Sequence, residues 1–259
     1  MNVFVQPHLD DVAWSCGGTV SLLGARAEAA GEAPCTILTV FDRSPDPTRS
    51  LSLFARMLHA AWGAGRDPLP MRRAENVRAL EILGARGESL DLHEALYRDP
   101  PVHSSGALLR PPGPSLAPLA HEIAERLVAS CEGAERVFLP LGIATHVDHV
   151  LCFSAHDRLR EAGVAVHHYE DFPYVTRAGK LAARLESLRA DPLEQLTVDV
   201  AHTLGTRIAA VRAYASQLRF MGMDRPDDLV RTHAAAVRPG GFGERFWTRD
   251  PGDLRAALR

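Results

Sequence analysis

The sequence lacks a dominant charge, a long apolar run and a charged leader. It has 29 Lys and Arg against 32 Asp and Glu, for a formal net charge of -3. Because no chain-wide positive field exists to attract phosphate backbones, we expect no nucleic-acid partner. No apolar run reaches the about 18 residues that a membrane span needs. No charged segment precedes the first apolar residues, as it would in a secretory signal. We therefore expect a cytoplasmic protein without a membrane span.

Paired cysteines and a glycine-rich phosphate loop are also missing. The four cysteines show no CxxC spacing and lie in apolar segments, which predicts buried free thiols in a reducing compartment; they are Cys16, Cys35, Cys131 and Cys152. Gly17-Gly18 comes too late after the first apolar run to form a GxGxxG loop. This spacing argues against dinucleotide binding.

What is present is an alternation of apolar runs and amphipathic segments. We expect strands over residues 2–6, 35–41, 89–92, 136–140 and 165–169, and helices over 12–30, 71–84, 116–131, from 147, and over 204–218. The pattern predicts a single α/β domain over 1–259, with a Rossmann-like, doubly wound and mostly parallel sheet. We expect the long Pro- and Gly-rich stretch 99–118 and the stretch 240–244 to shape the rim of a pocket.

Two short motifs carry the candidate chemistry. The first follows the first expected strand, and the second follows the expected strand 136–140; they read Pro7-His8-Leu9-Asp10-Asp11 and His146-Val147-Asp148-His149. Ligands of open α/β sheets bind beyond the carboxyl ends of the strands, so the two motifs are expected to meet there. A catalytic zinc site uses three protein ligands and keeps one position for water. His8, Asp11 and His149 would fill the three places.

The neighbouring residues fit the hydrolysis of an amide. The metal lowers the pKa of its water and polarises the carbonyl, and Asp10 beside it would accept the proton of the attacking water as general base. His146 lies one helical turn before His149, so it would stabilise the oxyanion or protonate the leaving amine. Asp148 would orient His146 and raise its pKa.

Other interpretations of the motifs stay open at this point. His-x-Asp-Asp after a strand is also typical of a helix N-terminus, where acidic residues satisfy free N–H groups, and His-x-x-His is typical of a solvated helix face. Two other classes of protein would use the same strand ends. One is a non-catalytic sugar- or nucleotide-binding module. The other is an Fe(II) enzyme with a 2-His-1-carboxylate ligand set.

The two motifs together resemble those of the LmbE-like or PIG-L deacetylases, which are metal-dependent enzymes that act on N-acetylglucosamine-containing substrates. The resemblance extends to Cys16-Gly17-Gly18-Thr19, Arg72-Arg73-Ala74-Glu75, Leu83-Gly84, the segment from Tyr169 to Tyr174, and Tyr214-Ala215-Ser216-Gln217. It implies His8, Asp11 and His149 as ligands of Zn²⁺ (or of Fe²⁺ or another divalent ion). It also implies Asp10 as the base, and His146 as the group that stabilises the transition state, with Asp148 behind it.

The resemblance further implies that Arg72 and Asp99 contact the sugar. Two positions depart from the family pattern. Leu9 replaces the usual proline, which removes a backbone restraint but no chemical group, and Ala144 stands where some members have a tyrosine near the reacting carbonyl. The expected partner is a small-molecule amino sugar, and neither the particular sugar nor a homo-oligomeric state can be read from the sequence.

Overall fold

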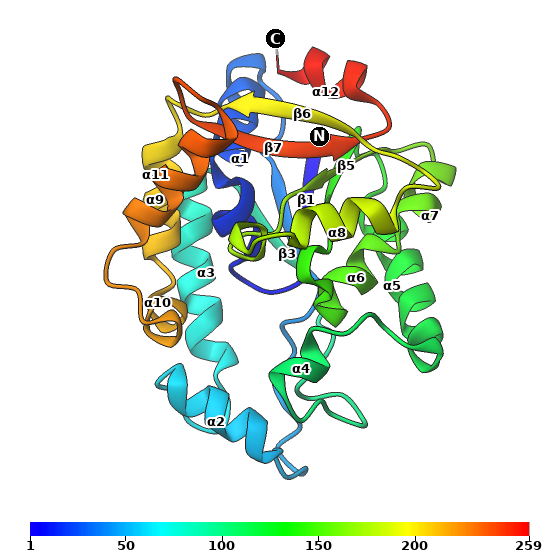
Figure 1. The fold of residues 1–259 in the computed structure, drawn as a ribbon, viewed down its shortest axis with the longest axis vertical. Helices are drawn as coiled ribbons and strands as arrows, with labels where there is room; N and C mark the ends of the chain where they lie inside the picture. The colour runs from blue at the N-terminus through cyan, green and yellow to red at the C-terminus, as the bar shows by residue number, and fades with distance from the viewer. Residues whose placement is uncertain (259) are drawn as a thin grey trace.

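The computed structural model describes residues 1–258 and is built on a seven-stranded sheet (Figure 1). The strand order is β3-β2-β1-β4-β5-β7-β6, and β7 alone runs antiparallel to its two neighbours. The strands are β1 (Asn2–Gln6), β2 (Thr36–Thr39), β3 (Arg86–Ser89), β4 (Arg136–Pro140), β5 (Ala165–Tyr169), β6 (Glu194–Asp199) and β7 (Gly243–Thr248). The expected mostly parallel, single-domain α/β fold is confirmed.

Helices cover both faces of the sheet (Figure 1). On one face lie α1 (Asp11–Ala30), α3 (Leu69–Leu83), α9 (Leu204–Arg212) and α11 (Pro226–Val237); on the other lie α5 (Ala117–Ser130), α6 (Val147–Phe153) and α7 (His156–Glu161). The remaining helices are α2 (Leu53–Ala61), α4 (Ser105–Leu108), α8 (Lys180–Ser187), α10 (Ala215–Met221) and α12 (Pro251–Ala257), with short 3-10 turns η1 (Pro114–Leu116), η2 (Ile143–Thr145) and η3 (Tyr174–Thr176).

The central strand β1 shows why the sequence forms this layered core. Phe4 packs into the core on the α1 side, whereas Val3 and Val5 pack into the core on the α5 side. All three side chains are almost fully buried. A strand covered on both faces must be apolar throughout, and this is what the run Asn2–Gln6 supplies.

The expected strands 2–6, 136–140 and 165–169 are confirmed, while the edges of the sheet differ from expectation. The third strand is Arg86–Ser89 and not 89–92, because this edge strand is exposed and has no apolar signal. The antiparallel pair β6 and β7 was not expected. The predicted helix 204–218 is two helices, since Tyr214 leaves the helical conformation between α9 and α10.

The burial of the cysteines and the length of the helices can also be compared with what the sequence predicts. The four cysteines are free and buried, as predicted. Within residues 1–258, no helix combines the length and the apolar character required to cross a membrane.

The stretch 240–244 does not shape a pocket rim, contrary to expectation. Glu244 is a buried residue of β7, and its carboxylate accepts hydrogen bonds from the backbone N–H groups of Gly18 (2.9 Å) and Thr19 (2.7 Å). It also forms an ion pair with buried Arg207 (3.2 Å). The helix α1 is kinked at Cys16, and Glu244 accepts the N–H groups that follow the kink. Gly18 thus allows a close approach to β7.

We expect Gly18→Ala to destabilise the protein by about 1–3 kcal/mol, because the new Cβ would lie 2.8 Å from Glu244 Oε1 and 3.0 Å from Val200 Cβ. Gly24→Ala in the same helix is the matched control. Its Cβ would meet nothing closer than 3.7 Å, so that variant should be as stable as the wild type or more stable. Thermal or urea unfolding of both variants measures the difference, and equal stabilities would contradict the close-packing argument.

Candidate metal centre and active site

The two motifs meet at the carboxyl edge of the sheet because β1 and β4 are parallel neighbours. The loop after β1 carries His8 and Asp10 into α1, which begins at Asp11. The loop after β4 leads through η2 into α6, whose N-cap is His146 and whose first turn holds His149. Residues more than a hundred positions apart in the chain therefore face one another, as expected for two motifs that each follow a parallel strand.

His8, Asp11 and His149 form a cluster that can hold a metal ion. One ligand atom of each lies within 4.8 Å of the others. Asp11 contacts both histidines, with its carboxylate 3.2 Å from Nδ1 of His8 and 3.4 Å from Nε2 of His149. Nε2 of His149 is buried and has no hydrogen-bond partner within the described chain. A buried nitrogen without a partner is costly, and a cation among these three groups would satisfy it. The residues fit a divalent metal.

The charges around the cluster favour a cation as well. Burial alone would lower the pKa of His8, but Asp11 and Asp148 outweigh it and raise this pKa to about 10. Burial likewise opposes ionisation of Asp11, yet His149 and His8 hold the pKa of this carboxyl below its usual range. The carboxylates are thus ionised and draw positive charge into the space between the two imidazoles. The same carboxylates would stabilise a metal ion between the two imidazoles, and its binding would displace the protons from its ligands.

Asp148 does not take the position expected of it. It was predicted to orient and charge His146, but its fully buried carboxylate binds Arg98 instead, accepts the backbone N–H of Ala95 (3.1 Å) and lies 3.1 Å from Nε2 of His8. The side chains of His8, His146 and Asp148 could also surround an ion. Because Arg98 already neutralises Asp148, the Asp11 cluster is the better metal site.

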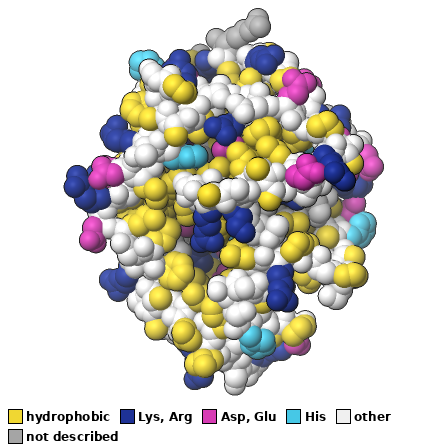
Figure 2. Space-filling view, viewed as in Figure 1, with side chains coloured by type: hydrophobic (Ala, Val, Ile, Leu, Met, Phe, Trp, Pro, Cys, Tyr) yellow, Lys and Arg dark blue, Asp and Glu magenta, His cyan; other side chains and the backbone are white. Residues whose placement is uncertain are grey.

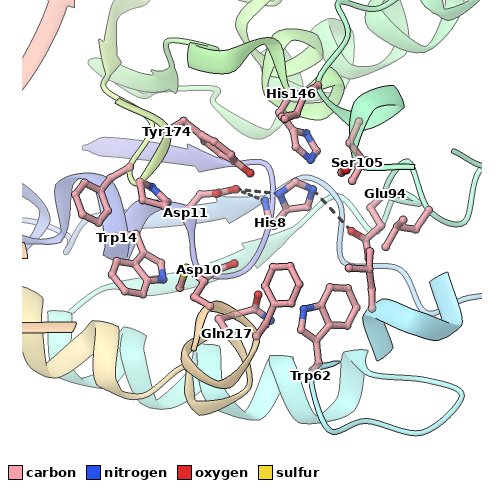
Figure 3. Close-up of a pocket in the computed structure, with 18 of the residues that line it drawn as sticks. His8, Asp10, Asp11, Trp14, Trp62, Glu94, Ser105, His146, Tyr174 and Gln217 are labelled. Atoms are coloured by element: carbon pink, nitrogen blue, oxygen red, sulfur yellow. Dashed lines mark hydrogen bonds and ion pairs between the residues drawn. The ribbon is translucent and has the colours of Figure 1, made fainter. Parts of the chain in front are cut away.

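The environment of His146 favours a neutral imidazole with a defined proton. Its Nδ1 accepts the backbone N–H of Asp148 (3.3 Å), so in the neutral ring the proton lies on Nε2. Burial, together with the charges of His149 and His8, lowers the pKa of His146 to about 3. Asp148 raises this pKa, as expected, but burial and the two other histidines outweigh its effect. His146 lines the cavity of the candidate site, and its ring points into this cavity (Figure 3).

Asp10 and Arg72 are brought together at the cavity, where the first motif places Asp10 and the family resemblance places Arg72. Arg72 is buried and donates a hydrogen bond to Asp10 Oδ1 (3.0 Å), and its guanidinium lies 5.1 Å from the centre of the Trp62 ring. Burial raises the pKa of Asp10 even though Arg72 opposes the shift. A carboxylate with a raised pKa is a stronger base, which suits proton transfer from water.

Asp99, which the family resemblance places at the sugar, lies away from the cavity. Its side chain is 73% exposed and pairs with Arg49 (3.0 Å), and it is not among the lining residues. Glu94, from the same connection after β3, lies there instead and is 8% exposed. Its Oε2 is 3.9 Å from His8, and its buried Oε1 has no hydrogen-bond partner within residues 1–258.

Asp171 is a site residue that the sequence reasoning missed. It lies just beyond β5, next to β4 in the sheet, and its Oδ1 is 2.5 Å from Nδ1 of His149. Oδ2 of Asp171 accepts the backbone N–H of Ile143 (2.9 Å). A carboxylate beside Nδ1 accepts a hydrogen bond from the Nδ1–H group, which keeps the ring proton there and leaves Nε2 of His149 free for a metal. The signal was available, because Asp171 is the first aspartate after a predicted parallel strand.

We expect Asp171→Asn to lower the affinity for the metal by about 10- to 100-fold. An amide that donates to Nδ1 would place the ring proton on Nε2, the atom that should bind the ion. Competition with a chromophoric chelator measures the affinity. Asp253→Asn is the matched control, since Asp253 contacts buried His167 (3.0 Å) away from the cavity. An unchanged affinity in Asp171→Asn would contradict the role of this carboxylate.

The structure compensates for the backbone restraint lost at Leu9. The hydroxyl of Tyr214 donates to the carbonyl oxygen of Leu9 (2.6 Å) and approaches Asn76 Oδ1 (2.8 Å). This contact fixes the first motif from the side of α10.

Ala144 and Thr145 have left-handed backbone conformations (φ 62° and 60°), which are strained for residues other than glycine and often occur at functional sites.

A cavity of about 620 Å³ opens over these residues. His8, Asp10, Asp11, Glu94 and His146 form what we call its inner end (Figure 3). Tyr174, which follows β5, stands edge-on to His149 with ring centres 5.7 Å apart. The volume falls within the about 300–1,000 Å³ of pockets for drug-sized ligands.

No family model matches the chain. A 2'-N-acetylparomamine deacetylase of Streptomyces fradiae is 28% identical over 275 residues, covering 98% of this chain and 91% of that protein. An enzyme of the same name from Niallia circulans is 28% identical over 188 residues, covering 66% of each chain.

Among solved structures, the zinc-inhibited form of the teicoplanin deacetylase Orf2 matches with a TM-score of 0.77 and 24% identity, over 95% of this chain and 96% of that one. At this identity the match shows the fold alone. The similarity to named deacetylases, which spans nearly the whole chain for the Streptomyces fradiae enzyme, agrees with the resemblance to deacetylases that the two motifs indicated.

Proposed function

We propose that this protein is a metal-dependent hydrolase that removes the N-acetyl group from an N-acetylglucosamine-type sugar or its conjugate. The observation that carries the proposal is the cluster of His8, Asp11 and His149 next to half-buried Asp10 at the cavity, with a ligand nitrogen that has no hydrogen-bond partner within residues 1–258. Both similar sequences are named as 2'-N-acetylparomamine deacetylases, and these names support removal of an N-acetyl group from an amino sugar.

His8, Asp11 and His149 would hold the metal, with Zn²⁺ as the proposed ion. When bound, such an ion polarises the acetyl carbonyl and acidifies a water molecule. Asp171 holds the proton of His149 on Nδ1. One structural neighbour is described as a zinc-inhibited form, so the identity of the native ion is the first quantity to measure.

The chain's own residues supply the proton transfers. Asp10 accepts a proton from the attacking water as the oxygen adds to the acetyl carbon, and Arg72 keeps this carboxylate oriented. Neutral His146 donates its Nε2–H to the carbonyl oxygen as negative charge develops there. Asp10 then returns its proton to the sugar nitrogen, the C–N bond breaks, and acetate and the free amine leave. Arg72 is proposed to contact the sugar as well.

The decisive experiment combines elemental analysis with an acetate-release assay. The purified protein is incubated with free, nucleotide-linked, lipid-linked and antibiotic-linked N-acetylglucosamine, before and after treatment with a chelator. We expect acetate release from at least one substrate, loss of release on chelation, and its return when a divalent metal is added back. Metal binding without acetate release would support the binding module or the Fe(II) enzyme instead.

A further inference from the structure

The cavity has two chemically different ends. Its inner end offers buried polar atoms without partners among the described residues, namely Nε1 of Trp14, Nε1 of Trp62 and Oε1 of Glu94. Sugar hydroxyl groups both donate and accept hydrogen bonds, so they can pair with these two N–H donors and this carboxylate oxygen. The outer end is different, because most of the remaining lining side chains are apolar.

Five of these side chains form what we call the apolar rim, and they come from α2, α10 and the turn after α10: Phe54, Leu58, Phe220, Met221 and Met223. Phe220 is 46% exposed and packs edge-to-face on Trp62, with ring centres 6.3 Å apart. Leu53 and Met57 on α2 are also exposed, at 66% and 62%. Figure 2 shows apolar side chains gathered over α10 and α2 beside the hollowed centre of this face.

Charge separates the two ends as clearly as polarity does. The carboxylates that line the cavity are Asp10, Asp11 and Glu94, all beside His8 or Arg72 at the inner end. The charged side chain that lines the cavity away from them is exposed Arg177, which lies over the Tyr174 ring. A substrate with several ammonium groups would find no carboxylate at the apolar rim and would meet a cation.

We infer that the apolar rim is an aglycone subsite, and that the protein acts on an amino sugar linked to an apolar alkyl or aromatic group and not to a polycationic aminocyclitol. The inference rests on the proposed function, since it assumes that the sugar occupies the inner end. The two ends are continuous within one cavity of about 620 Å³. The group attached to the sugar therefore extends towards the rim, where exposed Phe220 and the half-buried methionines would be covered by an apolar group.

The test compares the hexyl and methyl glycosides of N-acetylglucosamine as ligands of the metal-loaded Asp10→Asn protein, with binding measured by calorimetry so that turnover does not interfere. We expect the Kd of the hexyl glycoside to be at least about 20-fold lower, because several methylene groups become buried. In the double variant that also carries Phe220→Ser, this ratio should fall by about fivefold or more, while the Kd of the methyl glycoside stays within about twofold.

Ile82→Ser is the matched control, since Ile82 is an exposed apolar residue (39%) of α3 outside the cavity; it should change neither Kd. Equal affinities for the two glycosides would overturn the inference, as would tighter binding of 2'-N-acetylparomamine than of the hexyl glycoside. Acetate release by the wild-type protein is measured in parallel, so that failure of the aglycone subsite can be distinguished from failure of the proposed function. Acetate release with equal affinities defeats the subsite alone, whereas Phe220-dependent binding without acetate release defeats the deacetylase alone.

Discussion

Replacing Asp10 with asparagine is expected to lower the rate of acetate release by about 10²- to 10⁴-fold while the protein keeps its metal. The amide cannot accept a proton from water, so general-base catalysis is lost. The substitution is conservative in other respects, because an amide oxygen can still accept the hydrogen bond that Arg72 now donates (3.0 Å). Binding of the metal should persist, since His8, Asp11 and His149 are untouched.

The measurement is kcat by acetate release together with metal content by elemental analysis. Asp157→Asn serves as the control, because this carboxylate is 77% exposed and lies outside the cavity; its rate should equal that of the wild type. A near wild-type rate in Asp10→Asn would sink the assignment of the base. Loss of metal in this variant would instead show that Asp10 belongs to the ligand set.

The sequence predicted the central architecture because that architecture is encoded locally. The runs Asn2–Gln6, Arg136–Pro140 and Ala165–Tyr169 are short and apolar, and each is a strand with those bounds. Parallel strands also determine which chain ends meet, so the convergence of the two motifs could be predicted from the order of the elements. The strands β6 and β7 at the opposite edge could not. Their pairing is antiparallel, it joins residues far apart in the chain, and β6 is largely exposed.

The sequence predicted which types of residue form the candidate site, but it did not predict which residues their side chains contact. Histidines and aspartates at strand ends identified the cluster of His8, Asp11 and His149. The partner of Asp148 could not be predicted, because Arg98 comes from the connection after β3, and loops carry no periodic signal. The same connection places Glu94 at the cavity and turns Asp99 to solvent. Sequence spacing alone does not distinguish these two carboxylates, five residues apart.

Replacing His149 with alanine is expected to reduce the metal content from about one ion per chain to near none, because one of three protein ligands is lost. The effect should exceed that of Asp171→Asn, which keeps the ligand and changes only its proton. His149 is 1% exposed, so truncation also removes buried contacts. The control is His167→Ala, another fully buried histidine with an aspartate partner. It should cost comparable stability and leave the metal in place.

The comparison of these two variants separates binding from folding. If both lose stability and only His149→Ala loses metal, the ligand assignment is supported. His149→Gln tests the same point with a side chain that refills most of the space, and it too should lose metal, because an amide is a poor substitute for imidazole with zinc. Undiminished metal in either His149 variant would place the ion elsewhere, with the cluster of His8, His146 and Asp148 as the next set to test. In the His149 variants activity should be lost together with the metal, since the remaining residues move protons and stabilise the oxyanion but cannot replace the ion in acidifying the attacking water.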